Sequence, residues 1–128
     1  MKTNRKVLAV AVAVAALAVG AQAPGITRTV LQKGDVTADR EVVMARAEIS
    51  PGGATGRHTH PGPETGYVLE GSTTVEIDGQ PPKVYHAGDT YLIPQGTVHN
   101  AKDVGEKPAV VLAIYVVEKG KPLASPAP

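Results

Sequence analysis

Short apolar stretches that alternate with turn-forming residues constrain the fold of this 128-residue chain more than any other feature. The intervening segments are rich in glycine, proline and aspartate, which permit or force a reversal of the chain. Beyond the N-terminal apolar run, no segment keeps a helical period over about ten residues, so a doubly wound α/β fold is excluded. The pattern predicts an all-β domain, either a sandwich or a barrel.

Nine short strands are expected between these turns. They are Arg28–Gln32, Glu41–Ile49, Gly56–His60, Thr65–Leu69, Ser72–Ile77, Lys83–His86, Thr90–Ile93, Val98–Lys102 and Ala109–Glu118. The strand over residues 109–118 is apolar at both parities, which predicts a core on one face and a partner subunit on the other. Gly71 lies between two closely spaced strands, as a tight hairpin requires.

The first residues have the pattern of a secretory signal peptide. Three basic residues precede an unbroken apolar run over residues 7–19, and small residues follow. A membrane anchor needs about 20 apolar residues, and this run is shorter. Cleavage after Ala21 is favoured over cleavage after Ala23, because Pro24 would follow the second cut directly. We therefore expect export to the periplasm or secretion, with no membrane attachment after cleavage.

The composition is that of one globular domain, with 42% apolar residues, 20% charged residues and a formal net charge of +1. Loss of the signal peptide leaves ten basic and twelve acidic residues, which gives no basic surface for nucleic acid. Cysteine, phenylalanine and tryptophan are all absent. The fold must therefore rest on an aliphatic core, without disulfides, and thiolate ligands are excluded.

The stretch GRHTHPGPETGYVLEG, residues 56–71, places two histidines beside a glutamate. On a strand, the spacing of His58 and His60 sends both imidazoles to one face, about 6.5 Å apart along the backbone. The PGP segment then breaks the strand, so Glu64 begins the next one and can point back into the same space. Two histidines and a carboxylate favour a divalent first-row metal, although three polar residues near a turn also occur in solvated loops.

A second stretch, AGDTYLIPQGTVHNAKD, resembles the second motif of the cupin superfamily, and the first stretch resembles its first motif. The first motif, Gly-x5-His-x-His-x3-Glu-x6-Gly, is filled at every fixed position. The second, Gly-x5-Pro-x-Gly-x2-His-x3-Asn, is filled except at its last position, where Asp103 replaces an asparagine that is not a ligand in the family. The matching residues are Gly52, His58, His60, Glu64, Gly71, Gly88, Pro94, Gly96 and His99.

This resemblance implies a single jelly-roll β-barrel in which His58, His60, Glu64 and His99 converge on one metal. On this interpretation residues 1–21 are the signal peptide, 22–40 an N-terminal arm with the first strand, and 41–119 the cupin barrel. Residues 120–128 are expected to be a disordered tail, since they are short, proline-rich and terminal.

Strand parity separates other side chains from the metal. Arg57 precedes the first ligand and is expected to point away from it. Tyr67 and Leu69 are out of phase with Glu64, so they are expected on the outer face. Together with the apolar last strand, they predict a homodimer.

The ligand set allows an enzyme or a binding module. A divalent ion with three neutral imidazoles and one carboxylate keeps a net positive charge and open positions, and Glu64 is the candidate catalytic base. The first hypothesis is a metal-dependent oxidoreductase of the dioxygenase type, acting on a small oxygen-rich molecule. The alternative is a non-catalytic module that binds metal or a small-molecule ligand, for storage or sensing.

Few further side chains are available to an enzyme of this kind. Beyond Glu64, the candidate acids or bases are Tyr91, which can face either way, His86, expected to be an ordinary strand-end histidine, and Asp103. In a site without thiolates, copper or zinc is favoured, with manganese, iron or nickel as alternatives.

Overall fold

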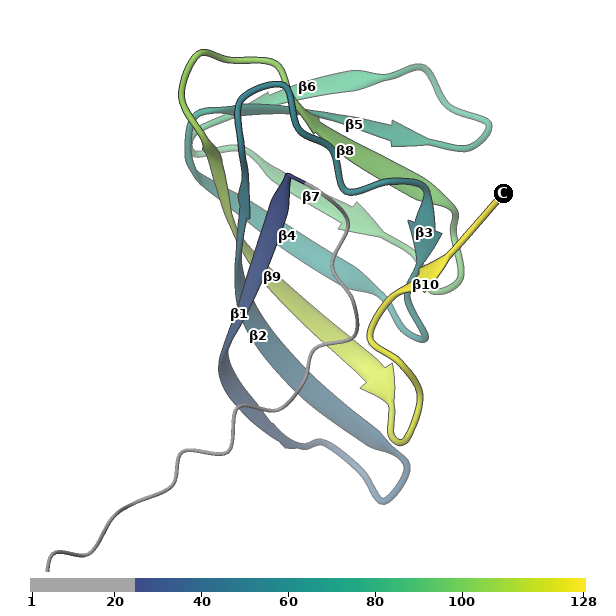
Figure 1. Cartoon of the computed structure of the whole chain (residues 1–128). Coiled ribbons are helices and arrows are strands. Elements are labelled where there is room, and N and C mark those ends of the chain that lie inside the picture. The colour runs from purple at the N-terminus through teal and green to yellow at the C-terminus, as the bar shows by residue number, and fades with distance from the viewer. Residues whose placement is uncertain (1–24) are drawn as a thin grey trace, which may run out of the picture.

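Two antiparallel β-sheets of five strands each form the described part of the chain, residues 25–128 of a computed structural model (Figure 1). The expected all-β, jelly-roll-like architecture is confirmed. The signal peptide expected over residues 1–21, and both cleavage positions, lie outside the described residues. Within residues 25–128, no helix has the length and apolar character needed to cross a membrane.

The first sheet has the longer strands and the order β1-β2-β9-β4-β7. Its strands are β1 (Ile26–Asp35), β2 (Arg40–Ile49), β9 (Ala109–Glu118), β4 (Glu64–Glu70) and β7 (Thr90–Ile93). The second sheet has the order β10-β3-β8-β5-β6. Its strands are β10 (Ser125–Pro126), β3 (His58–Thr59), β8 (His99–Asp103), β5 (Ser72–Ile77) and β6 (Lys83–His86). The strand expected over residues 56–60 is thus shortened to two residues.

The expectation of a tight hairpin at Gly71 is wrong. The strands on either side of it, β4 and β5, belong to different sheets, so the chain turns a corner between the sheets. Gly71 has a φ of +71°, and a Cβ there would lie 2.7 Å from the carbonyl oxygen of Pro108. Only glycine accepts both this conformation and this close approach.

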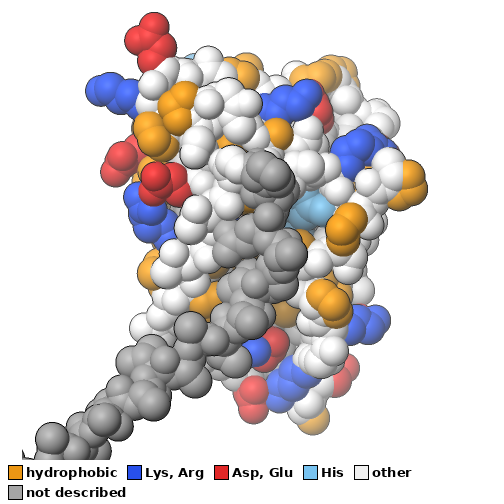
Figure 2. Space-filling model, viewed as in Figure 1, with side chains coloured by type: hydrophobic (Ala, Val, Ile, Leu, Met, Phe, Trp, Pro, Cys, Tyr) orange, Lys and Arg blue, Asp and Glu red, His pale blue; other side chains and the backbone are white. Residues whose placement is uncertain are grey.

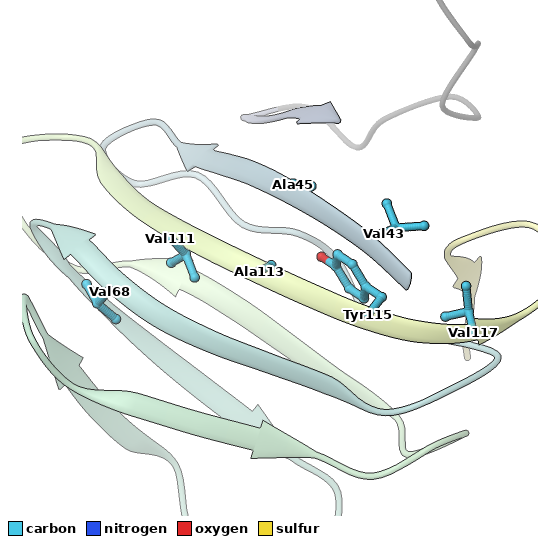
Figure 3. Packing of buried hydrophobic residues seen from close by; sticks show 7 residues of the cluster. All are labelled: Val43, Ala45, Val68, Val111, Ala113, Tyr115 and Val117. Carbon is cyan, nitrogen blue, oxygen red and sulfur yellow. The ribbon is translucent and has the colours of Figure 1, made fainter. Parts of the chain in front are cut away.

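The core lies on the inner face of the first sheet, where alternate residues of β9 point the same way (Figure 3). The buried cluster consists of Val43, Ala45, Val68, Val111, Ala113, Tyr115 and Val117. Apart from Tyr115, these side chains are aliphatic, as the absence of phenylalanine and tryptophan requires. Apart from the buried Val110, the outward residues of β9 are half-buried in the single chain.

The C-terminal segment was expected to be disordered, and this expectation is wrong. Ser125 and Pro126 form β10, which pairs with β3 (Figure 1). The Ala127 N–H donates to the Arg57 carbonyl oxygen at 3.0 Å. Composition alone missed this pairing, because the two-residue strand β3 offers a free edge that becomes visible only in the folded sheet.

Charged side chains of both signs are interspersed on the face shown in Figure 2. Several of them form ion pairs at the surface of the described chain. Examples are Arg46 with Glu48 at 2.6 Å and Lys102 with Glu76 at 2.7 Å. These pairs involve half-exposed side chains and contribute little to stability.

Candidate metal centre

Three histidines and one glutamate meet between the two sheets. His58, His60 and His99, called here the three-histidine cluster, come from β3, the residue after it and the first residue of β8, and Glu64 begins β4. All four side chains are buried, with 3 to 6% of their surface exposed. Sequence reasoning expected these four residues together, and the structure brings them together.

The local backbone explains this convergence. His58 lies opposite His99 in the register of β3 and β8. After His60, the PGP turn passes so close to β9 that a Cβ on Gly62 would lie 1.8 Å from the Val116 carbonyl oxygen. The chain can therefore cross from the second sheet to the first within three residues, which places Glu64 beside the histidines.

The distances between the polar atoms of the site are short. His58 Nε2 lies 3.1 Å from His60 Nε2. One carboxylate oxygen, Glu64 Oε2, lies 3.0 Å from His60 Nε2 and 3.3 Å from His99 Nε2. Two ligand atoms that each lie about 2.1 Å from one ion, at right angles, are about 3 Å apart. The separations therefore fit ligand atoms that share a single ion.

The opposite nitrogen of each ring fixes its tautomer. His58 Nδ1 lies 2.7 Å from the Gly56 carbonyl oxygen, and His60 Nδ1 lies 2.6 Å from that of Leu123. His99 Nδ1 lies 2.9 Å from the Thr97 carbonyl oxygen. A carbonyl oxygen only accepts hydrogen bonds, so each Nδ1 carries the proton and donates. In the neutral ring the Nε2 lone pair then faces the centre of the cluster, as in a metal-ligating imidazole.

The charge states of the site fit the same arrangement. Burial lowers the pKa of His58 to about 4, so this ring is neutral near pH 7. Burial alone would raise the pKa of Glu64, but the nearby Nε2 atoms of His60 and His99, which stabilise the carboxylate whenever a proton lies on them, outweigh burial and lower that pKa below its usual range. Glu64 is therefore a carboxylate. A carboxylate and three nitrogen lone pairs face one another stably only where a cation or a proton lies between them.

Tyr91 orients the glutamate. Its hydroxyl donates to Glu64 Oε1 at 2.9 Å, which leaves Oε2 towards the histidines. The Tyr91 ring lies over Gly66, where a Cβ would be only 2.1 Å from its Cζ atom. Burial, followed by the charge of Glu64, raises the pKa of Tyr91 well above its usual value, so the hydroxyl keeps its proton. Strand parity left the direction of Tyr91 open, and in the structure this side chain faces the site.

Sequence reasoning missed two side chains and one backbone group. Arg28 on β1 places Nη2 3.5 Å from His58 Nε2, and the Tyr115 ring centroid lies 4.8 Å from that of His60. The Leu123 carbonyl, from the C-terminal segment, accepts the hydrogen bond of His60. A signal for Arg28 was present, since it shares inward parity on β1 with apolar side chains. No comparable signal marks a backbone carbonyl.

Other candidates lie outside the site. The exposed His86 has Nδ1 2.8 Å from Ser72 Oγ, and Arg57 pairs with Asp78 at 2.7 Å, away from the cluster. Asp103 is not a second acid at the site, because its carboxylate accepts the N–H groups of Gly105 and Ala109 at 2.7 and 3.0 Å. It fixes the loop between β8 and β9 instead, which accounts for an aspartate at that motif position.

Tyr67 and Leu69 are on the outer face, with 46% and 44% of their surface exposed. Their expected direction, away from Glu64, is confirmed. Val68 between them is fully buried, as its in-phase position predicts.

The cluster opens into an internal cavity between the sheets. Its walls include Arg28, Tyr91 and Tyr115, and the remainder is mostly aliphatic. The cavity has a volume of about 20 Å³, enough for one or two ordered waters or a group of a few atoms. The three buried imidazoles could thus hold a metal ion beside a very small ligand.

Comparisons with known proteins agree with this geometry. The cupin domain family matches residues 45–115, a range that contains all four side chains. Germin-like protein 5-1 of Oryza sativa subsp. japonica is 35% identical over 79 residues, which cover 58% of this chain and 36% of that protein. The rhicadhesin receptor of Pisum sativum is 39% identical over 80 residues, which cover 56% and 36%. The match therefore spans about a third of these curated relatives.

Solved structures show the same fold. A recombinant oxalate oxidase in complex with glycolate is 29% identical with a TM-score of 0.65, over 80% of this chain and 55% of that one. The oxalate decarboxylase of Lactobacillus farciminis, in a formate complex, is 28% identical with a TM-score of 0.54, over 58% and 23%.

Proposed function

The chain belongs to the cupin domain family, and on that premise we propose that the three-histidine cluster and Glu64 bind one divalent transition metal that acts on a small oxygen-rich molecule. One observation carries this proposal. All three Nδ1 atoms are engaged by backbone carbonyls, which leaves three Nε2 lone pairs and a carboxylate oxygen converging. Such an arrangement is costly to bury without a cation.

The protein groups around this centre have distinct roles. When bound, the divalent ion supplies Lewis acidity and open positions for an oxygen-containing ligand. Glu64 is the candidate catalytic base, because Oε2 faces the centre and, once it leaves the ion, can accept a proton from a bound molecule. The hydroxyl of Tyr91, at 2.9 Å, holds the other oxygen and keeps Oε2 in place. Tyr91 is therefore a positioning residue for the carboxylate.

We propose copper or zinc as the resident metal. The donor set contains nitrogen and oxygen and no thiolate, and for such sites affinity rises towards copper along the first-row series. Elemental analysis of protein purified from its native compartment tests this. Mainly copper or zinc is expected, and mainly manganese, iron or nickel would contradict the proposal.

The reaction class that fits best is an oxidation of the dioxygenase type. An oxalate oxidase with bound glycolate is among the similar structures, and the small cavity here favours substrates of a few atoms. Oxygen uptake by copper-loaded and manganese-loaded protein, across small hydroxy acids, diketones and catechols, tests this class. Uptake that Glu64→Gln abolishes is expected. Absence of uptake with both metals would contradict the proposal that the protein is an oxidative enzyme.

The limited size of the cavity favours a second candidate, a non-catalytic module for a metal or a small ligand. About 20 Å³ of open space leaves little room for a substrate and O₂ together. Under this alternative, calorimetry would detect metal and ligand binding while every substrate in the panel remained unchanged.

We also propose that two copies pair through the outer face of the first sheet. Tyr67, Leu69 and Leu92 are 46%, 44% and 61% exposed there in the single chain, and apolar patches of this kind favour association. Light scattering is expected to give twice the chain mass. A monomer at micromolar concentration would reject the dimer.

A further inference from the structure

Arg28 is the one strongly basic side chain among the residues that line the internal cavity. It lies on β1, half-buried, in phase with the buried Ile26. Its Nη2 is 3.5 Å from His58 Nε2, an atom that also faces the centre of the three-histidine cluster. The guanidinium therefore lies directly beside the position of the proposed ion.

The charges inside the cavity do not balance once a metal is present. Glu64 is the one acidic side chain among the lining residues, and its charge is matched by Arg28. The two tyrosines that line the cavity, Tyr91 and Tyr115, are phenols, which are neutral near pH 7. A divalent ion would leave two uncompensated positive charges among aliphatic walls. Buried charge without a counter-charge is strongly disfavoured, so an anion is the complementary ligand.

A second cavity lies beside the internal one. It holds about 170 Å³ and lies between β1, β3 and the C-terminal segment. It shares Arg28, Thr55 and His58 with the internal cavity. Arg28 thus belongs to the walls of both cavities, and its guanidinium is within reach of a molecule in either.

We propose that the ligand of this centre is a small carboxylate anion and that Arg28 is the residue that selects it. The inference rests on the proposed metal site and goes beyond it. A guanidinium offers paired N–H donors that match the two oxygens of a carboxylate. Because the open space is only about 20 Å³, the group that enters must be as small as formate or the carboxylate end of a slightly longer acid.

The test compares formate with formamide, which has nearly the same shape and no charge. Copper-loaded protein is titrated with each at constant ionic strength, and the change in the copper absorption spectrum gives the dissociation constant. Wild-type protein is expected to bind formate at least tenfold more tightly than formamide. Arg28→Gln is expected to weaken formate binding at least tenfold and to leave formamide binding within twofold.

Two further variants control the result. Arg46→Gln removes the same charge from the adjacent strand β2, but Arg46 pairs with Glu48 at the surface and does not line the cavity. Its formate affinity is expected within twofold of wild type. Arg28→Lys keeps the positive charge but loses the paired N–H donors of the guanidinium. Its formate affinity is expected to lie between those of wild type and Arg28→Gln.

Metal content, measured on every sample, separates the possible failures. A wild-type chain without copper would overturn the proposed function, and this inference with it. Equal formate affinity in metal-loaded Arg28→Gln and wild type would overturn the inference and leave the metal site standing. Loss of copper in both Arg28 variants would assign Arg28 a structural role and also overturn the selection proposed here.

Discussion

The two sheets of the molecule differ in what they contribute. The first sheet has three ten-residue strands, long paired stretches and a mostly aliphatic inner face. The second has short strands, and between β3 and β8 the register holds a single pair, His58 with His99. Yet all three imidazoles come from the second sheet or the loop after β3. The first sheet is thus a stable scaffold, whereas the second sheet, in which β3 is only weakly paired with β8, carries the histidines. A bound ion would connect the two sheets.

Removal of the metal is expected to have the largest effect on stability, because the ion would connect the two sheets. At free metal about a thousandfold above the dissociation constant, binding stabilises the native state by about 4 kcal/mol. A chelator should therefore lower the Tm by about 15–30 °C, as measured by calorimetry.

The loss of stability should also differ between the two sheets. Amide exchange should rise most in β3 and β10, and least where β2 pairs with β9. An unchanged Tm after verified removal of the metal would show that the sheets do not depend on it.

A cavity in the scaffold should weaken the fold without emptying the site. Val68→Ala removes two methyl groups from a fully buried position of β4, which is expected to cost about 2–3 kcal/mol of unfolding free energy. Urea denaturation of the chelated protein measures it. The matched control is Val84→Ala on β6, the same change at a side chain that is 44% exposed, expected within about 0.5 kcal/mol. Equal effects at both positions would contradict the burial assigned to Val68.

Deletion of residues 121–128 should lower metal affinity in the second sheet more than it lowers the stability of the first sheet. It removes the Leu123 carbonyl that accepts the hydrogen bond from His60 Nδ1 at 2.6 Å. Loss of a group that orients a ligand typically lowers metal affinity by about 10-fold or more, and competition with a chromophoric chelator measures this. Unaltered affinity would mean that the C-terminal segment does not orient His60.

The smallest effect is expected at a surface ion pair of the scaffold. Arg46 and Glu48 lie 2.6 Å apart, with both side chains 41% exposed. Arg46→Ala should change the unfolding free energy by less than about 0.5 kcal/mol, in the same denaturation assay. A loss of unfolding free energy as large as that of Val68→Ala would mean that surface ion pairs stabilise the first sheet as much as its core does.

The same contrast explains what sequence alone could predict. Strands such as Ser72–Ile77 and Ala109–Glu118 were predicted with the bounds that the structure shows, because alternation and flanking turns are local signals. The four converging side chains were expected from the resemblance to the two cupin motifs. Gly71 was misjudged, because a positive φ serves a corner between sheets as well as a hairpin.

Long-range partners were the features that could not be predicted. The pairing of β10 with β3, the Leu123 carbonyl on His60 and the approach of Arg28 to His58 all join residues far apart in the chain. Strand periodicity says which face a side chain occupies, but not which distant group it meets there. Tyr91 shows this limit, since its direction depends on the missing side chain of Gly66 on the neighbouring strand.

The most direct test is the metal content of two histidine variants of the second sheet. His99→Ala removes a nitrogen that lies 3.3 Å from the Glu64 carboxylate, whereas His86→Ala removes an exposed imidazole outside the cluster. After dialysis against metal-free buffer, elemental analysis should find about one ion per chain in wild type and His86→Ala, and about a tenth of that or less in His99→Ala. One full equivalent retained in His99→Ala would contradict a single ion held between the two sheets.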